Sequence, residues 1–382
     1  LEREKLDAEY NELLQKIAYY REILNSRRVL LGVIEQELLE IKEKYADERR
    51  TKIMPAAEEI DIEDLIEKEA VVISLTERGY IKRTPADEYK VQQRGGKGIR
   101  GMTTKDDDYV RHLYVVSTHD EIQFFTNQGR LYTLTAYNIP EGGRTSRGQA
   151  IVNLLQLEPN EVIEAMFPKS AALSKDKYFV MMTKKGTLKK TATSNFMNVR
   201  ASGIRAITLA EDDELVAVRI AKEDGEILIV TKEGMSVRTS LAAVRGVGRS
   251  AMGVKGITLG KKDEVIDMDV VKDLPYVLVI SENGYGKKTL IEHYTLQNRG
   301  GKGLKTYKVT KKTGSIIAGM LVDKADEVLL MSQNNDLIRL EVAKISTLGR
   351  STQGVKLKDV KSEEERIVAV AKYMDDWDPA ES

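Results

Sequence analysis

The feature that most constrains this chain is a repeat of about fifty residues, which begins near Val71 and recurs six times. Each unit opens with an apolar run, a turn residue and a second run of strand character, as in residues 227–238. The turn residues are Gly79, Gly129, Gly186, Gly234, Gly284 and Asn335. Because Gly and Asn best tolerate the left-handed backbone of tight hairpins, the repeat predicts six β-hairpins in a fixed register.

A second series of glycines keeps the same register in the loop that follows each hairpin. Its members are Gly98, Gly148, Gly203, Gly253, Gly303 and Gly354, and each precedes a closing apolar strand by 12–14 residues. Periods of 40–50 residues with several strands per unit are typical of propellers, whose units bury their apolar faces only against each other. A linear array is the weaker alternative. We therefore expect a mainly β, six-bladed, propeller-like domain over residues 70–372.

The first fifty residues follow a helical period instead of a strand period. Apolar residues recur at steps of three and four, which is the spacing of a coiled-coil seam: Leu6, Tyr10, Leu13, Ile17, Tyr20 and Leu24, then Leu30, Ile34, Leu38, Ile41 and Tyr45. Ser26 interrupts the pattern and is a plausible N-cap for a second helix. This predicts a short helical coiled-coil segment at 1–50 and an acidic linker at 51–69, with an acidic tail at 373–382 beyond the repeats.

Composition limits the function classes. The chain has no cysteine, which excludes disulfides and cysteine-ligated metals, and no apolar run of the roughly 20 residues that a membrane span needs. We expect a cytoplasmic protein. The net charge is zero, yet residues 71–362 hold 46 basic and 34 acidic residues, a balance of +12. A basic central region between acidic ends favours a polyanion as partner. The same charge balance is equally compatible with scattered charges that only keep the domain soluble. The tail either folds back on the basic surface or only keeps the chain soluble.

One repeat position is almost always basic. Four residues after each turn residue stand Arg83, Thr133, Lys190, Arg238, Lys288 and Arg339, and the exception has Arg130 directly after its glycine. Alternate residues of a strand share a face. The register therefore predicts a circular track of positive charge, against the alternative of a solvated face with no function.

Further basic residues flank the second glycine series: Arg94, Lys97, Arg144, Arg147, Arg200, Arg205, Arg245, Arg249, Lys255, Arg299, Lys302 and Arg350. Glycines let backbone N–H groups approach an anion, and neighbouring cationic groups neutralise it. This pattern predicts a rim that holds duplex DNA through its phosphates, without reading bases.

The most specific segment is a glycine-rich basic loop in the first unit, formed by Gln92, Gln93, Arg94, Gly95, Gly96, Lys97 and Gly98, with a partial copy at 297–303. Here the chain resembles the family of bacterial DNA gyrase A proteins, whose signature box reads Gln-Arg-Arg-Gly-Gly-Lys-Gly. Gln93 replaces the first arginine of the box. The resemblance covers essentially the whole chain, including the helical segment, residues 151–155 and residues 283–287.

The resemblance implies a six-bladed β-pinwheel, a propeller relative whose blades exchange strands, which wraps DNA with positive handedness. It implies that residues 92–98 let the holoenzyme introduce negative supercoils. That holoenzyme would contain two A and two B subunits, with ATP and Mg²⁺ on the B subunits and no cofactor in this chain.

We expect no catalytic or metal-binding residue here. The family's nucleophilic tyrosine follows an arginine, and none of the 16 tyrosines does. No segment fits a phosphate-binding loop, Asp106, Asp107 and Asp108 are typical of a solvated loop, and His112, His119 and His293 are too scattered to form a ligand set. Two alternatives remain beside a gyrase A C-terminal domain: the corresponding domain of topoisomerase IV, and a non-enzymatic protein-interaction propeller.

Overall fold

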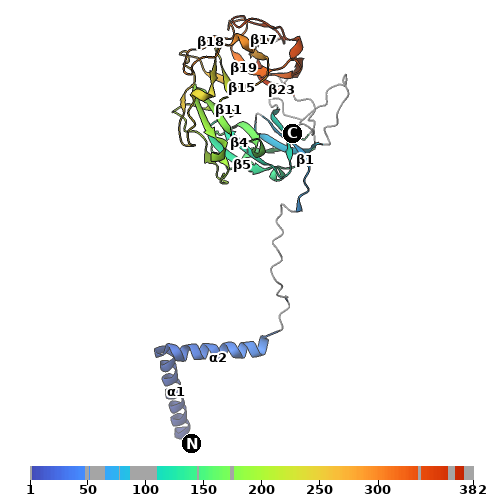
Figure 1. Cartoon of the computed structure of the whole chain (residues 1–382). Helices are drawn as coiled ribbons and strands as arrows, with labels where there is room; N and C mark the ends of the chain where they lie inside the picture. Colours follow the sequence, from blue (N-terminus) through green and yellow to red (C-terminus); the bar gives the residue numbers. More distant parts are fainter. Residues whose placement is uncertain are drawn as a thin grey trace. The chain divides into compact units, whose positions relative to one another are not determined.

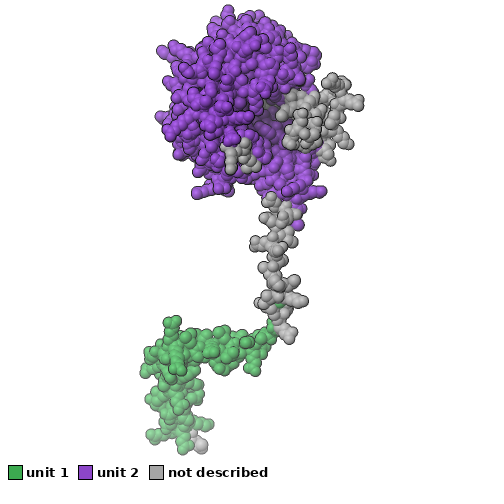
Figure 2. Space-filling view, viewed as in Figure 1, with its two compact units in different colours: residues 1–61 green, residues 62–382 purple. Residues whose placement is uncertain are grey.

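The computed structural model of this chain describes residues 2–47, 51, 65–76, 78–86, 110–143, 146–172, 176–333, 337–359 and 366–373. The chain divides into two compact units, Leu1–Asp61 and Ile62–Ser382, which have separate colours in Figure 2. Most of the predicted linker and all of the predicted tail beyond Tyr373 lie outside the described residues. The glycine-rich loop at 92–98 lies outside them as well.

Two helices form the described part of the first unit: α1 (Glu2–Asn25) and α2 (Arg27–Tyr45) (Figure 1). Ser26 lies between them, and its Oγ accepts a hydrogen bond from the backbone N–H of Val29 at 3.4 Å. This confirms the predicted N-cap, which satisfies one of the N–H groups that a helix leaves unpaired at its start. Neither helix buries a residue. The apolar seam is therefore exposed, and the coiled coil itself stays a prediction.

The second unit consists of six antiparallel hairpins and their closing strands. Five turn glycines have φ between 73° and 88°, the left-handed region that the sequence pattern predicted for them. The first three repeats contain β1 (Ala70–Thr76), β2 (Tyr80–Pro85), β3 (Val110–Ser117), β4 (Glu121–Thr126), β5 (Arg130–Thr135), β6 (Gln149–Ala150), β7 (Ile163–Pro168), β8 (Lys177–Thr183), β9 (Thr187–Ala192), β10 (Ile204–Arg205) and β11 (Leu215–Lys222). The last three contain β12 (Glu226–Thr231), β13 (Met235–Ser240), β14 (Val254–Lys255), β15 (Val265–Val271), β16 (Tyr276–Ser281), β17 (Tyr285–Leu290), β18 (Leu304–Lys305), β19 (Ile316–Val322), β20 (Glu327–Ser332), β21 (Leu337–Glu341), β22 (Val355–Lys356) and β23 (Ile367–Tyr373).

A short 3₁₀ turn follows the second strand of most hairpins. These turns are η3 (Ala136–Asn138), η6 (Thr193–Phe196), η7 (Leu241–Ala243), η8 (Ile291–His293) and η9 (Val342–Lys344). Two further turns, η4 (Ile151–Asn153) and η5 (Lys169–Ala172), lie on either side of β7. After each of the first five turns, the next short strand along the chain pairs with the sheet of the preceding repeat.

Consecutive repeats exchange one strand. The sheet orders are β3-β1-β2-β6, β10-β5-β4-β7, β11-β8-β9-β14, β15-β12-β13-β18 and β19-β16-β17-β22. In each of these sheets, three strands come from one repeat and the two-residue strand comes from the next repeat. The sixth sheet has the order β21-β20-β23 among the described residues. This confirms the six-bladed arrangement with strand exchange that the resemblance implied.

The second glycine series lets each exchanged strand reach its neighbour. A Cβ added at Gly303 would lie 2.3 Å from the backbone oxygen of Ser236, and φ there is +76°. Only glycine has neither a Cβ to clash nor a steric penalty at this φ. The loop of one repeat therefore passes directly over the strand of the preceding one, and this contact explains why both glycine series keep the same register.

The longer closing strands occupy the opposite edges of the sheets and contact one another in sequence order, from β3 through β7, β11, β15 and β19 to β23. Figure 1 shows the sheets following one another around this common centre. The exchanged two-residue strands are consequently on the periphery, at the edge of each sheet that points away from the centre. Residues on these short strands form the outer rim.

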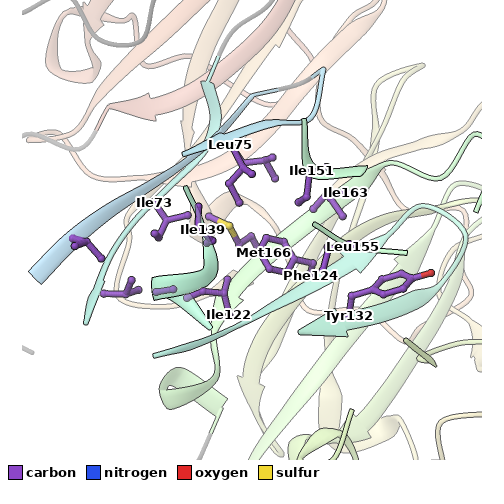
Figure 3. Close-up of a cluster of buried hydrophobic side chains, with 14 residues drawn as sticks. Ile73, Leu75, Ile122, Phe124, Tyr132, Ile139, Ile151, Leu155, Ile163 and Met166 are labelled. Carbon is purple, nitrogen blue, oxygen red and sulfur yellow. The ribbon is translucent and has the colours of Figure 1, made fainter. Parts of the chain in front are cut away.

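Among the residues that the structure describes, five hydrophobic clusters hold the sheets together, and each one spans two consecutive repeats. The first combines Ile73 and Leu75 of β1 with Ile122 and Phe124 of β4 and Met166 of β7 (Figure 3). All five of these side chains are at most 1% exposed. A single repeat has too little buried surface of its own, so the repeats depend on their neighbours for stability, as in other repeat proteins.

Candidate nucleic-acid interface

Basic side chains gather on the peripheral short strands. Two residues after the second-series glycine, four of the five described short strands carry an exposed cation: Arg205, Lys255, Lys305 and Lys356. The fifth has Ala150 there. Sequence reasoning missed Lys305 and Lys356, although the pattern Gly-x-Lys/Arg recurs in five of the six units and would have identified them.

A second basic register lies in the loop before each short strand, four residues ahead of the glycine. Arg249, Arg299 and Arg350 occupy it in the last three units. A guanidinium N–H of Arg299 donates to the carbonyl of Lys255 at 3.4 Å, and one of Arg350 donates to the carbonyl of Lys305 at 3.3 Å. Each of these two arginines thus reaches back to the basic strand of the preceding unit.

Together the two registers form a band that runs from one unit to the next along the periphery. We call it the rim band, and it consists of Arg205, Arg249, Lys255, Arg299, Lys305, Arg350 and Lys356.

Four other predicted residues lie in the same loops or beside them. Arg200, Arg245 and Lys302 are exposed, and Arg200 lines one surface groove with Arg205 and Arg249. Arg147 lies 3.6 Å from the centre of the Tyr80 ring, a cation–π contact. Arg144 lies outside the described residues, as do Gln92 to Gly98.

One rim cation has an acidic partner. Lys356 Nζ lies 2.7 Å from a carboxylate oxygen of Asp359, which raises the pKa of the lysine through a hydrogen bond and charge attraction. DNA bound there would have to compete with this carboxylate for the ammonium group. The remaining rim lysines, Lys255 and Lys305, form no ion pair with any acidic residue in the described ranges.

The predicted circular track at four residues after each turn is wrong for two of its members. Lys190 and Lys288 are only 2% exposed. The ammonium of Lys190 donates to the carbonyl of Leu241 at 2.8 Å, and that of Lys288 donates to the carbonyls of Val342 and Ala343 at 2.6 and 2.9 Å. These carbonyls belong to the 3₁₀ turns η7 and η9 of the following repeat. At these two positions the lysine joins consecutive repeats, and burial lowers the pKa of both lysines.

The arginines of that register are also engaged within the protein. Arg238 pairs with Glu226 at 2.6 Å and donates to the carbonyls of Ile291 and Tyr294 in the next repeat. Arg83 pairs with Glu141 at 3.0 Å. The other members and the predicted substitute behave similarly: Arg339 pairs with Glu327, Thr133 is half-buried, and Arg130 donates to the carbonyl of Ser202. Alternation along a strand was the correct rule, but Lys190, Arg238 and Lys288 reach the following repeat from this position, whereas Arg339 of the sixth unit is exposed.

The described residues offer neither a metal site nor a membrane-spanning helix. Within those ranges, no group of three His, Cys, Asp or Glu side chains is arranged to hold a metal ion. Asp106, Asp107 and Asp108 lie outside that part of the chain. Neither of the two described helices combines the length and apolarity required to cross a membrane.

Comparison with known proteins identifies the family of the repeat. The family described as "DNA gyrase C-terminal domain, beta-propeller" matches six times, at residues 70–117, 120–168, 177–222, 225–272, 275–323 and 326–372. The DNA gyrase A protein of Clostridium acetobutylicum is 50% identical over 376 residues, covering 98% of this chain and 45% of the relative. That of Halalkalibacterium halodurans is 50% identical over 372 residues, covering 97% and 44%. The chain thus spans a little under half the length of these relatives.

Two solved structures share the fold. The C-terminal domain of a DNA gyrase A protein aligns with a TM-score of 0.65 at 30% identity, over 80% of this chain and all of that one. The C-terminal domain of a DNA topoisomerase IV aligns with a TM-score of 0.69 at 23% identity, over 80% of this chain and 94% of that one. The latter identity supports the shared fold alone.

Proposed function

Because this chain belongs to the DNA gyrase C-terminal domain family, we propose that it binds duplex DNA along the rim band and bends it around the periphery of the blades. The observation that carries this proposal is the continuity of the band, in which an arginine of one unit bonds to the basic strand of the unit before it. A duplex that follows this band meets a cation in each unit from the third to the sixth. Its phosphates supply the binding energy, and no base needs to be read.

We further propose that the chain acts within a holoenzyme of two A and two B subunits, in the bacterial cytoplasm. There the wrapped DNA would be delivered to the strand-passing core so that ATP hydrolysis introduces negative supercoils. The ATP site and the Mg²⁺ ions would lie on the B subunit, which leaves DNA capture as the task of this chain. The box at 92–98 would contribute to the same surface through Arg94 and Lys97.

The test is ligation of singly nicked circular DNA in the presence of the chain, followed by gel separation of the topoisomers. We expect a shift toward positive linking number, because a right-handed wrap stores positive writhe in the closed circle. Tight binding without a shift would instead support a topoisomerase IV type of function. An absence of binding at low salt would refute the proposal and support a protein-interaction propeller.

A further inference from the structure

Three lysines are buried at the same place in alternate repeats. Lys82, Lys189 and Lys287 stand three residues after the turn glycines of the first, third and fifth units, and each is 0% exposed. A lysine almost never becomes fully buried unless its ammonium group finds partners. We therefore expect each of the three buried lysines to have hydrogen-bond partners inside the protein.

The partners of these ammonium groups include backbone carbonyls in the basic loop of the following unit. Lys287 Nζ donates to the carbonyls of Gly349 and Arg350, both at 2.5 Å, and to Oγ1 of Thr352 at 3.1 Å. Three acceptors match the three hydrogens of an ammonium group. Burial, together with the nearby guanidinium of Arg350, lowers the pKa of Lys287 to about 7.

The other two lysines make the corresponding contacts. Lys189 Nζ donates to the carbonyl of Arg249 at 2.5 Å and to that of Ala206 at 2.7 Å. Lys82 Nζ donates to the carbonyl of Gly143 at 3.0 Å, directly before Arg144 in sequence. In the third and fifth units the acceptors thus include the backbone of a rim-band arginine itself.

The intervening units show that the fold does not need a lysine here. Tyr132 and Val237 occupy the same position in the second and fourth units, and both are buried. There the following loop rests on the side chain directly, since a Cβ added at Gly203 would lie 2.6 Å from the Tyr132 ring, and one at Gly303 would lie 2.9 Å from Val237. What the lysine adds is a set of hydrogen bonds that fixes the loop carbonyls.

We propose that Lys189 and Lys287 are positioning residues: their buried side-chain nitrogens donate to backbone carbonyls of the basic loops of the fourth and sixth units and hold the conformation that presents Arg249 and Arg350 to DNA. Lys82 makes the same kind of contact with the loop of the second unit. This inference rests on the proposed function, because it assigns these loops to the DNA-binding rim. In these blades the loop is already ordered before DNA binds. The entropy cost of ordering the loop is then part of folding and does not reduce the affinity for DNA.

The test compares Lys287→Met with the control variant Val277→Ala. The control removes buried volume from the same blade, but the Val277 side chain makes no hydrogen bond to the loop. If the Met variant's loop adopts the binding conformation about a tenth of the time, DNA affinity falls about tenfold. The control should bind DNA as the parent chain does. Because Lys287 touches no phosphate, the dependence of affinity on salt should keep its slope, whereas Arg350→Ala should reduce the slope by about 0.9.

A second variant keeps the inference testable if Lys287→Met does not fold. Thr352 is exposed, so Thr352→Val should fold while removing one acceptor from the Lys287 ammonium. The Thr352 hydroxyl also donates to the Gly349 carbonyl at 2.8 Å, so the variant loosens the loop through both contacts. We expect about a twofold loss of DNA affinity with an unchanged salt slope, and faster amide exchange of residues 349–353. Affinity and exchange equal to those of the parent chain would overturn the inference.

Amide hydrogen exchange of residues 349–353 separates this inference from the proposed function. Faster exchange in Lys287→Met, with exchange in Val277→Ala unchanged, would support loop positioning whether or not DNA binds. Unchanged exchange in Lys287→Met would overturn it. If the loop is loosened but the parent chain itself fails to bind DNA, the proposed function fails and the loop-holding contact stands.

Discussion

Removing Lys255 and Lys305 together should weaken DNA binding through charge alone. Both residues are exposed at the ends of two-residue strands, β14 and β18, on the periphery. Their backbones already pair with the preceding repeats through Thr187 and Met235. Truncation of the side chains in Lys255→Ala/Lys305→Ala should therefore leave the sheet hydrogen bonds, and with them the fold, intact.

The magnitude follows from counterion release. Each phosphate that a cation neutralises contributes about −0.9 to the slope of log affinity against log salt concentration. The slope of the double variant should therefore be less negative than that of the parent chain by about 1.8. At about 0.1 M salt this corresponds to roughly 60-fold weaker binding, and the difference should almost vanish near 1 M. If all seven residues of the rim band each neutralise one phosphate, the slope of the parent chain should be about −6.

The assay is fluorescence anisotropy of a labelled duplex, titrated with the chain at several salt concentrations. Lys261→Ala/Lys262→Ala is the matched control, because it removes the same charge from exposed lysines that line a different groove, together with Asp212 and Glu214. We expect the control to keep the parent slope. Equal slopes for the two double variants would refute the reasoning, since the rim band would then bind DNA no better than any other lysines.

Three further predictions concern single contacts. Asp359→Ala should raise DNA affinity severalfold at low salt by releasing Lys356, as measured in the same titration, and an unchanged affinity would show that Lys356 does not contact DNA. Gly303→Ala should destabilise the fold by about 1–3 kcal/mol in urea unfolding, because its Cβ meets a backbone oxygen at 2.3 Å; Gly349→Ala, with nothing within 4 Å, should cost far less, and equal costs would contradict the close approach. The free energy of unfolding should also rise between pH 7 and 9, because the pKa of Lys287 is lowered in the folded state to about 7 and the unfolded chain therefore binds more protons in this window. The rise, measured by urea unfolding, should be smaller in Lys287→Met. An identical pH profile in the two chains would refute the lowered pKa.

Strand exchange has a consequence for how the domain responds to mutation. Each hydrophobic cluster and each exchanged strand joins two consecutive repeats, so damage in one repeat reaches its neighbours. Nearest-neighbour coupling of this kind is the rule in repeat architectures. A substitution such as Gly303→Ala should therefore weaken the packing of the fourth and fifth units together, since the loop of one crosses the strand of the other.

Much of the architecture followed from the sequence alone. The period of the repeat, the turn glycines and the loss of helical spacing after residue 50 are local properties, and backbone sterics at positive φ are the same in any fold. They predicted six hairpins, the helix break at Ser26 and the propeller class. The basic character of the loops beside the second glycine series was equally readable, and Arg205, Arg249, Lys255, Arg299 and Arg350 are all part of the rim band.

The sequence could not decide which basic register faces solvent. Lys190 and Lys288 have the same spacing in their repeats as an exposed ladder would have, yet the neighbouring sheet covers them. Lys305 and Lys356, by contrast, extend from the periphery because the short strand that carries them crosses to another repeat. Strand periodicity determines only that two residues share a face. Which face meets water depends on how the blades pack side by side, and that packing is set by contacts between residues far apart in the sequence, which exist only in the folded chain.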